Sequence, residues 1–377
     1  MSISARTKTS DAVLWMLSVA YSVQAYVFPL TGGNVFALYI TQFLFAAVFA
    51  FLYIAGTIPG GKVFKKNMIC IASVSGFLVL TIIVNQRSYT NNQETFVIIK
   101  LIGFSVTWAI FSWLASNVDV AHFFRRIALC LLPILTYVVI MHYNNALKSR
   151  AVPFGLQPNW WGELTVAFAV ASAGFKEFKH RLTLYAVAAI VIFIVQSRSA
   201  WLALGVIGLI EFGRLSETSP VSMRLKLMGI IIFTAVLCIA TPIIRLFIVN
   251  KILFLNNPYR GLGTGLTGRI SGWLDAISAG FRSPFFGTGF STYLFVHNGY
   301  LQMLVETGVL FFSAICLWII IKIGCLLRRC DWIQLTAVAA PAAFIFVEPR
   351  MFNLNMDSMF FWLGMLHWNN NKMSHKN

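Results

Sequence analysis

Three residues of this sequence have side chains suited to an anionic, phosphorylated group and to proton transfer: Arg198, Arg269 and His297. An arginine guanidinium presents a planar fork of N–H donors that matches phosphate oxygens. A histidine titrates near neutral pH and can act as a general acid or base. These types predict a site that holds an anion and moves a proton.

Arg198 lies between two short apolar runs that are predicted to form a tight helical hairpin. Ser197 precedes it, and the local sequence is Gln196-Ser197-Arg198-Ser199-Ala200-Trp201. One interpretation is a fixed cation for phosphate at the hairpin tip. The alternative is an interfacial anchor beside Trp201.

Arg269 follows a glycine-rich turn, Thr264-Gly265-Leu266-Thr267-Gly268-Arg269. Gly268 would let the backbone approach a ligand closely, and a helix N-terminus offers free N–H groups to an anion. The alternative is an ordinary surface helix capped by Thr267. Apolar residues at helical spacing predict an amphipathic helix at the membrane interface, with Trp273 near the headgroups; they are Leu266, Ile270, Trp273, Leu274 and Ile277.

His297 precedes a long apolar run, and Asn298 suits the N-cap of the helix expected there. Asn298, Gln302 and Glu306 recur at four-residue spacing, so they form a polar stripe on an apolar helix. We expect Glu306 to support the His297 end of this helix. The alternatives are a histidine that only caps the helix, and a Glu306 that is a structural ion pair or a protonated carboxyl group.

Glu163 is a further acidic residue inside an apolar run, after Pro158-Asn159-Trp160-Trp161. A carboxylate is unfavourable at membrane depth unless it has a partner. Glu163 could pair with an outer arginine. The competing interpretation is local charge satisfaction.

The composition identifies the environment of these residues. Of 377 residues, 58% are hydrophobic and only 11% are charged, with a net charge of +17. This excludes a soluble globule, a disordered chain and a disulfide scaffold, and a nucleic-acid binder would be far more polar. No His or Cys spacing is typical of a metal site, so we expect no metal and no cofactor.

The apolar runs predict an all-α, polytopic membrane bundle of about twelve transmembrane helices. They are 11–30, 33–55, 67–84, 95–115, 124–142, 159–175, 182–196, 199–213, 227–246, 298–321, 332–347 and 356–368. With both termini in the cytoplasm, 18 of the 29 Lys and Arg fall in cytoplasmic segments, Arg181, Lys322 and Arg328 among them, and 10 fall outside. We therefore expect one integral membrane domain over 1–377, with a larger periplasmic loop at 247–297 that carries short amphipathic helices.

Taken in order, these motifs resemble the O-antigen ligase and O-antigen polymerase superfamily of bacterial polytopic glycosyltransferases. The matching segments are Pro158-Asn159, Ser197-Arg198-Ser199-Ala200-Trp201, Thr267-Gly268-Arg269 with Trp273, Pro284-Phe285-Phe286-Gly287-Thr288-Gly289-Phe290, His297-Asn298-Gly299-Tyr300-Leu301 and Glu306-Thr307-Gly308.

The resemblance implies transfer of a glycan from an undecaprenyl-diphosphate carrier at the periplasmic face of the inner membrane. Arg198 and Arg269 would hold the diphosphate, and His297 would take the proton of the acceptor hydroxyl. The anomeric centre would be inverted, and no metal would be needed. Ser197, Gly268, Asn298, Glu306 and Glu163 would support this site.

The resemblance leaves two acceptors open. A ligase transfers the glycan to lipid A-core, which we slightly favour, whereas a polymerase transfers it to a lipid-linked repeat unit and makes O-antigen, capsule or exopolysaccharide. Two further classes are a twelve-span transporter or lipid flippase and a membrane scaffold. A transporter would show internal repeats and polar sites near the midplane, and neither is visible in this sequence.

Overall fold

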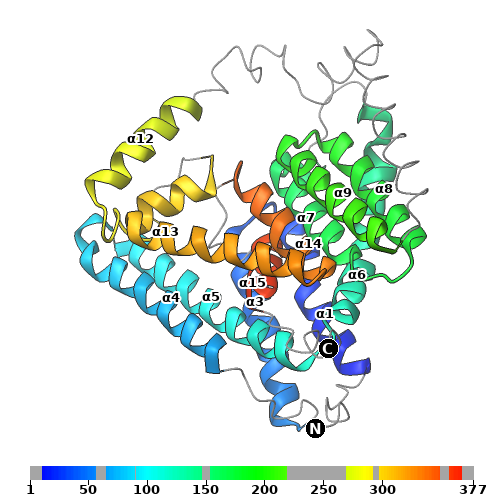
Figure 1. The fold of residues 1–377 in the computed structure, drawn as a ribbon, viewed down its shortest axis with the longest axis horizontal. Helices are drawn as coiled ribbons and strands as arrows, with labels where there is room; N and C mark the ends of the chain where they lie inside the picture. Colours follow the sequence, from blue (N-terminus) through cyan, green and yellow to red (C-terminus); the bar gives the residue numbers. More distant parts are fainter. Residues whose placement is uncertain are drawn as a thin grey trace.

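The computed structural model describes residues 11–56, 65–89, 91–146, 153–218, 269–291, 297–348 and 356–366. All regular secondary structure in these ranges is helical (Figure 1). The helices are α1 (Asp11–Ser22), α2 (Gln24–Leu30), α3 (Val35–Ile54), α4 (Lys65–Val84), α5 (Asn91–Asn117), α6 (Val120–Ala146), α7 (Pro158–Ser172), α8 (Phe178–Val195), α9 (Arg198–Thr218), α12 (Arg269–Arg282), α13 (Gly299–Arg328), α14 (Trp332–Ile345) and α15 (Met356–Leu366), with 3-10 turns at Gln86–Ser88 and Pro153–Gly155.

Eight helical segments of the described ranges are long and apolar enough to cross a membrane. They are Asp11–Leu30, Phe36–Ile54, Asn67–Val84, Gln93–Ala115, Val120–His142, Phe178–Val195, Arg198–Glu217 and Gly299–Arg328. The prediction of an all-helical membrane bundle is thus confirmed. Of the other predicted spans, three correspond to the shorter helices α7, α14 and α15, and 227–246 lies outside the described residues.

The three short helices form the centre of the bundle. Every residue of α7 except Asn159 is buried, and so is every described side chain of α15. Both helices pack against α14 and against each other. Large aromatic side chains fill the surrounding core, among them the fully buried Trp108, Trp161 and Trp362.

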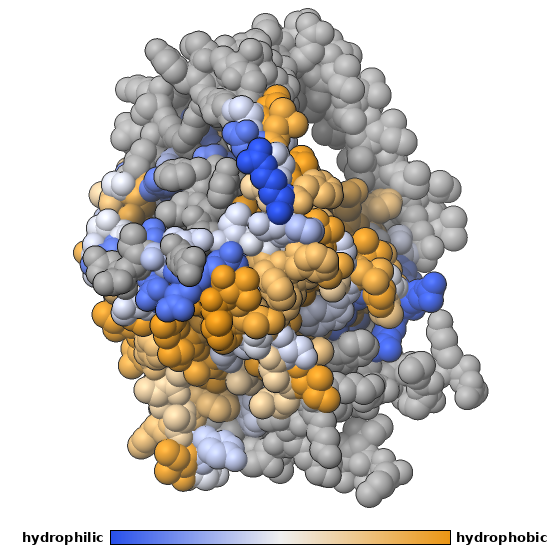
Figure 2. Space-filling view, turned by 90° about the vertical axis from the view of Figure 1, so that its left-hand side faces the viewer, coloured by the Kyte–Doolittle hydropathy of each residue, from blue (hydrophilic) through white to orange (hydrophobic). Residues whose placement is uncertain are grey.

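The outer helices present apolar side chains to their surroundings. Ile40, Ile54 and Leu209 are all more than 60% exposed, which is what lipid-facing positions of membrane helices require. Figure 2 views the left-hand side of Figure 1, where apolar residues cover much of the middle and lower surface and hydrophilic residues lie above them and toward both sides at about mid-height. This distribution fits a protein whose sides face lipid.

Among the basic residues assigned to cytoplasmic loops, Arg126, Arg181 and Lys322 are buried, and this corrects the sequence analysis. Arg181 is only 3% exposed, donates to the Glu211 carboxylate at 3.0 Å and donates to the carbonyl oxygens of Phe175 and Lys176. Lys322 is 3% exposed inside α13, which continues seven residues past its predicted end at 321. Counts of basic residues treat all of them as loop charges, although a buried partner can hold an arginine inside the bundle.

Candidate functional site

The first turns of α7 contact the hairpin that carries Arg198 and the residues that follow α14. A Cβ added at Gly162 would lie 2.7 Å from the Cβ atom of Ser197 and in closer contact with its hydroxyl oxygen. One turn earlier, the Asn159 amide donates to the Glu348 carboxylate at 2.8 Å, just after α14. The N-terminal end of α7 therefore lies between the hairpin that carries Arg198 and the end of α14.

The hairpin between α8 and α9 is as tight as the sequence predicted. Gln196 caps α8 in the left-handed region at φ 54° and ψ 48°, where a non-glycine residue is uncommon. Ser197 is fully buried, its hydroxyl pairs with that of Ser199 at 3.2 Å, and Arg198 begins α9 with a partly exposed side chain. The turn thus fixes Arg198 at a helix N-terminus.

Glu348, which contacts Asn159 of α7, also lies against the start of α13, the helix that His297 precedes. A Cβ added at Gly299 would lie 2.9 Å from the Glu348 carbonyl oxygen, so α13 begins directly against the end of α14. The Asn298 side chain accepts from the backbone N–H groups of Tyr300 and Leu301 at 3.0 Å, which confirms the predicted N-cap. His297, one residue earlier, is exposed.

The predicted polar stripe on α13 is also present in part. The Gln302 amide donates to the Glu306 carboxylate at 2.7 Å, and Glu306 is only 2% exposed. Asn298 caps the same helix, so the stripe runs from the buried carboxylate to the residue that follows His297.

Sequence analysis missed a break in α13 and the loop that fills it. Gly308 has φ 81° and ψ 171°, so the helix axis is interrupted there. The Thr288 N–H donates to the Val305 carbonyl oxygen and the Val309 N–H donates to the Pro284 carbonyl oxygen, both at 2.8 Å. Residues 284–291, which we call the docking loop, thus satisfy backbone groups that the break leaves free. The sequence signal for this break and loop was the pair of glycine-containing motifs, Pro284-Phe285-Phe286-Gly287-Thr288-Gly289-Phe290 and Glu306-Thr307-Gly308.

The helix predicted after Gly268 exists, although Trp273 does not share its exposed apolar face as the sequence suggested. Arg269 is the first residue of α12, and its side chain, like Gly268 and Thr267, lies outside what the structure describes. α12 packs on the start of α13 (Figure 1), where a Cβ at Gly280 would lie 2.7 Å from the Leu304 side chain. Trp273 packs toward α13 with Ala276 and Val305, whereas the exposed apolar face is Ile270, Leu274, Ile277 and Phe281.

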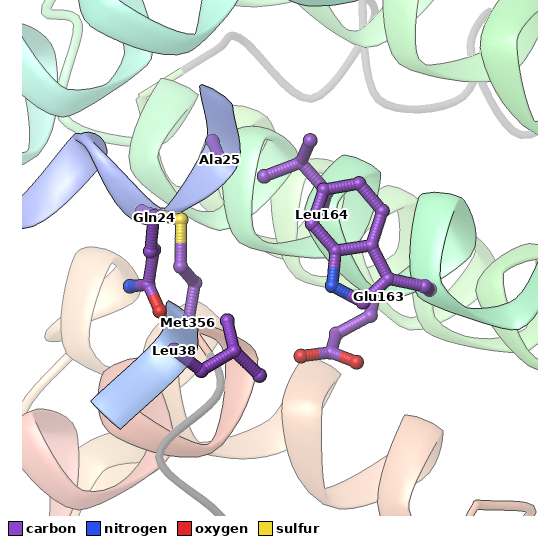
Figure 3. A pocket seen from close by; sticks show the side chains of 7 residues that line it. Gln24, Ala25, Leu38, Glu163, Leu164 and Met356 are labelled. Atoms are coloured by element: carbon purple, nitrogen blue, oxygen red, sulfur yellow. The ribbon is translucent and has the colours of Figure 1, made fainter. Parts of the chain in front are cut away.

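Glu163 lies apart from these contacts, one residue after Gly162. It is 3% exposed, and its carboxylate extends from α7 toward a pocket of about 10 Å³, the space of a single water molecule (Figure 3). Gln24 lines the same pocket and accepts from the Gln42 amide at 3.0 Å. Pairing of Glu163 with an outer arginine stays a prediction.

One substitution tests the contact between α7 and the hairpin. Gly162→Ala should lower the free energy of unfolding by about 1–3 kcal/mol, because the new methyl group overlaps the Cβ atom of Ser197. The measurement is thermal unfolding of the purified protein in detergent. Gly205→Ala is the matched control, since that helical glycine of α9 has no atom within 4 Å of an added Cβ. Equal unfolding temperatures for the two variants would contradict the close contact.

No group of three or more His, Cys, Asp or Glu among the described residues could hold a metal ion. The predicted site residues include instead an arginine at the N-terminus of α9, an exposed histidine before α13 and a carboxylate buried two turns into α13. The chain is a polytopic helical membrane protein that carries these groups near the starts of two helices.

The family model described as O-antigen ligase matches residues 183–316, about a third of the chain. This match confirms the resemblance to the O-antigen ligase and polymerase superfamily, and it supports a glycosyltransferase-type ligase or polymerase activity on lipid-linked polysaccharides. The matched segment includes Ser197, Arg198, Gly268, Arg269, His297, Asn298 and Glu306, whereas Glu163 lies before it. No curated protein and no solved structure matches the chain.

Proposed function

We propose that this protein transfers a glycan from undecaprenyl diphosphate to lipid A-core, as an O-antigen ligase. The reaction takes place at the periplasmic face of the bacterial inner membrane, and both termini lie in the cytoplasm. The chain is one integral membrane domain in this proposal, with 247–297 as its larger periplasmic loop.

The observation that carries the proposal is the family match over 183–316, which contains both the hairpin with Arg198 and the start of α13 with His297. These two segments are far apart in sequence, and both are joined to the first turns of α7 through Ser197 and Glu348. A cation and a general base held near one helix end suit a reaction between an anionic donor and a hydroxyl acceptor.

The chemistry needs only side chains. Arg198 and Arg269 bind the diphosphate and stabilise the negative charge that grows on it as it leaves. The acceptor hydroxyl oxygen attacks the anomeric carbon, the bond from that carbon to the diphosphate oxygen breaks, and His297 takes the hydroxyl proton. Attack from the face opposite the leaving group inverts the anomeric centre. Neither a metal ion nor a cofactor takes part, so transfer should continue in excess chelator.

A strain that lacks the gene tests the acceptor through its surface glycan. A ligase predicts lipid A-core without polymer, together with accumulated long lipid-linked polymer, and both should be reversed by the wild-type gene. Lipid A-core that carries a single repeat unit would show that the protein is an O-antigen polymerase and not a ligase. Unchanged glycans of every class would exclude glycan transfer and favour a transporter or scaffold.

A further inference from the structure

The docking loop is non-helical backbone that lies against membrane-spanning helices. Such backbone is tolerated at membrane depth only where protein groups bind its N–H and C=O groups. α13 supplies part of that binding through Val305 and Val309. Further contacts come from α4, where the Phe77 ring stacks on that of Phe286, and from α5 and the turn before it. These elements lie outside the segment that matches the family model.

Tyr89 and Lys100 make the contacts between the docking loop and α5 with its preceding turn. The Tyr89 hydroxyl donates to the Phe290 carbonyl oxygen at 2.8 Å, and the Lys100 ammonium donates to the Ser291 hydroxyl at 3.2 Å. The same ammonium lies 5.0 Å from the centre of the fully buried Phe290 ring, within the range of a cation–π contact. Two side chains therefore hold the end of the docking loop.

Lys100 carries a charged group at a buried position, which is unusual. It is 6% exposed and lies nine residues into α5, about 14 Å along the helix axis from Asn91. A buried ammonium needs a compensating charge. Glu306 interacts electrostatically with Lys100, and Glu306 in turn accepts from Gln302. Lys100 thus joins α5 to the docking loop by direct contacts, and its charge is partly balanced by that of Glu306 on α13.

The break at Gly308 explains how contacts made by Lys100 and the docking loop can affect the position of His297. It separates residues 299–307, which we call the α13 head, from the rest of α13. His297 directly precedes the α13 head, whereas Val305 and Glu306 lie at its base, where the docking loop and Lys100 act. A small tilt at the base of a short helix displaces its other end.

We propose that Lys100 and Tyr89 are positioning residues for His297. They fix the docking loop and, through Val305 and Glu306, the α13 head. They touch neither the donor nor the acceptor. This inference rests on the proposed function, in which His297 is the general base.

The test uses variants that remove single hydrogen bonds without changing shape. The double variant Tyr89→Phe/Ser291→Ala loses both side-chain hydrogen bonds to the end of the docking loop, and Lys100→Met also loses the charge and its contact with the Phe290 ring. Ser75→Ala is the matched control, because it removes a hydroxyl pair with Ser105 at 2.9 Å between α4 and α5 that does not involve a residue of the docking loop. Each purified full-length variant is assayed with a polyprenyl-diphosphate-linked glycan.

Positioning predicts a specific kinetic change. The kcat of the double variant should fall at least about tenfold while the KM for the donor changes less than about twofold, since misplacement affects the reacting geometry and not donor binding. Hydrogen exchange should become faster in residues 284–307, and Ser75→Ala should match the wild type in both measurements.

Three results would overturn the inference. In the first, the double variant has the kcat and the hydrogen-exchange rates of the wild type. In the second, its loss of activity disappears when rates are divided by the amount of folded protein. In the third, Ser75→Ala loses as much activity as the double variant. An inactive wild-type protein would instead refute the proposed function, and exchange in residues 284–307 would still decide whether Tyr89 and Lys100 hold the loop.

Discussion

Replacing His297 with alanine should lower glycan transfer by at least about 100-fold, because a general base typically contributes 10²–10⁴-fold to rate. The fold should be unaffected, since His297 is exposed and the helix cap is supplied by Asn298. The measurement is the single-turnover rate with a polyprenyl-diphosphate-linked glycan and a purified acceptor, at equal amounts of folded protein.

His122→Ala is the control for this experiment. His122 is also a histidine near the start of a helix, but it pairs with Asp119 at 2.6 Å at the beginning of α6. It should transfer glycan at the wild-type rate. A His297→Ala variant with more than half of the wild-type rate would remove His297 from the chemistry.

Replacing Arg198 with alanine should reduce transfer by about 10²–10³-fold, the loss seen when a preorganised donor to a developing negative charge is removed. Arg198 begins α9, so the helix N-terminus and the guanidinium would act on the same diphosphate. Arg198→Lys should recover part of the rate, because an ammonium keeps the charge but lacks the planar fork. Rates and donor affinity are measured in parallel.

Arg282→Ala provides the matched loss of a positive charge. Arg282 is exposed in the last turn of α12 and lies outside the proposed site. If both alanine variants slow transfer equally, the effect comes from general positive charge. Arg198 would then be the interfacial anchor beside Trp201 that the sequence also allowed.

Local sequence was a good guide to features that depend on neighbouring residues. The hairpin before Arg198, the Asn298 cap and the Gln302–Glu306 contact all follow from spacings of a few residues. Apolar runs likewise predicted where the membrane helices lie. The roles of Arg198, Arg269 and His297 are a separate matter and stay predictions.

Features that depend on distant contacts could not be predicted in this way. Hydropathy continues through Gly308, but a helix break is stable there only because residues 284–288 bind its free backbone groups. The contact between Lys100 and Ser291 could not be predicted, because the two residues are 191 positions apart. Nothing near Glu348 in the sequence indicates its contact with Asn159.

The shortness of the central helices has a consequence for where chemistry would occur. α7, α14 and α15 contain 15, 14 and 11 residues, so each is about 16–22 Å long, against about 30 Å for the hydrocarbon layer. None of these helices, over the residues that the structure describes, is long enough to cross that layer by itself. In the proposed function, groups held at the first turn of α7 would therefore lie below the headgroup level, and a carrier lipid would deliver its diphosphate there without its tail leaving the bilayer. The lower dielectric at that depth strengthens the attraction between an arginine and a phosphate.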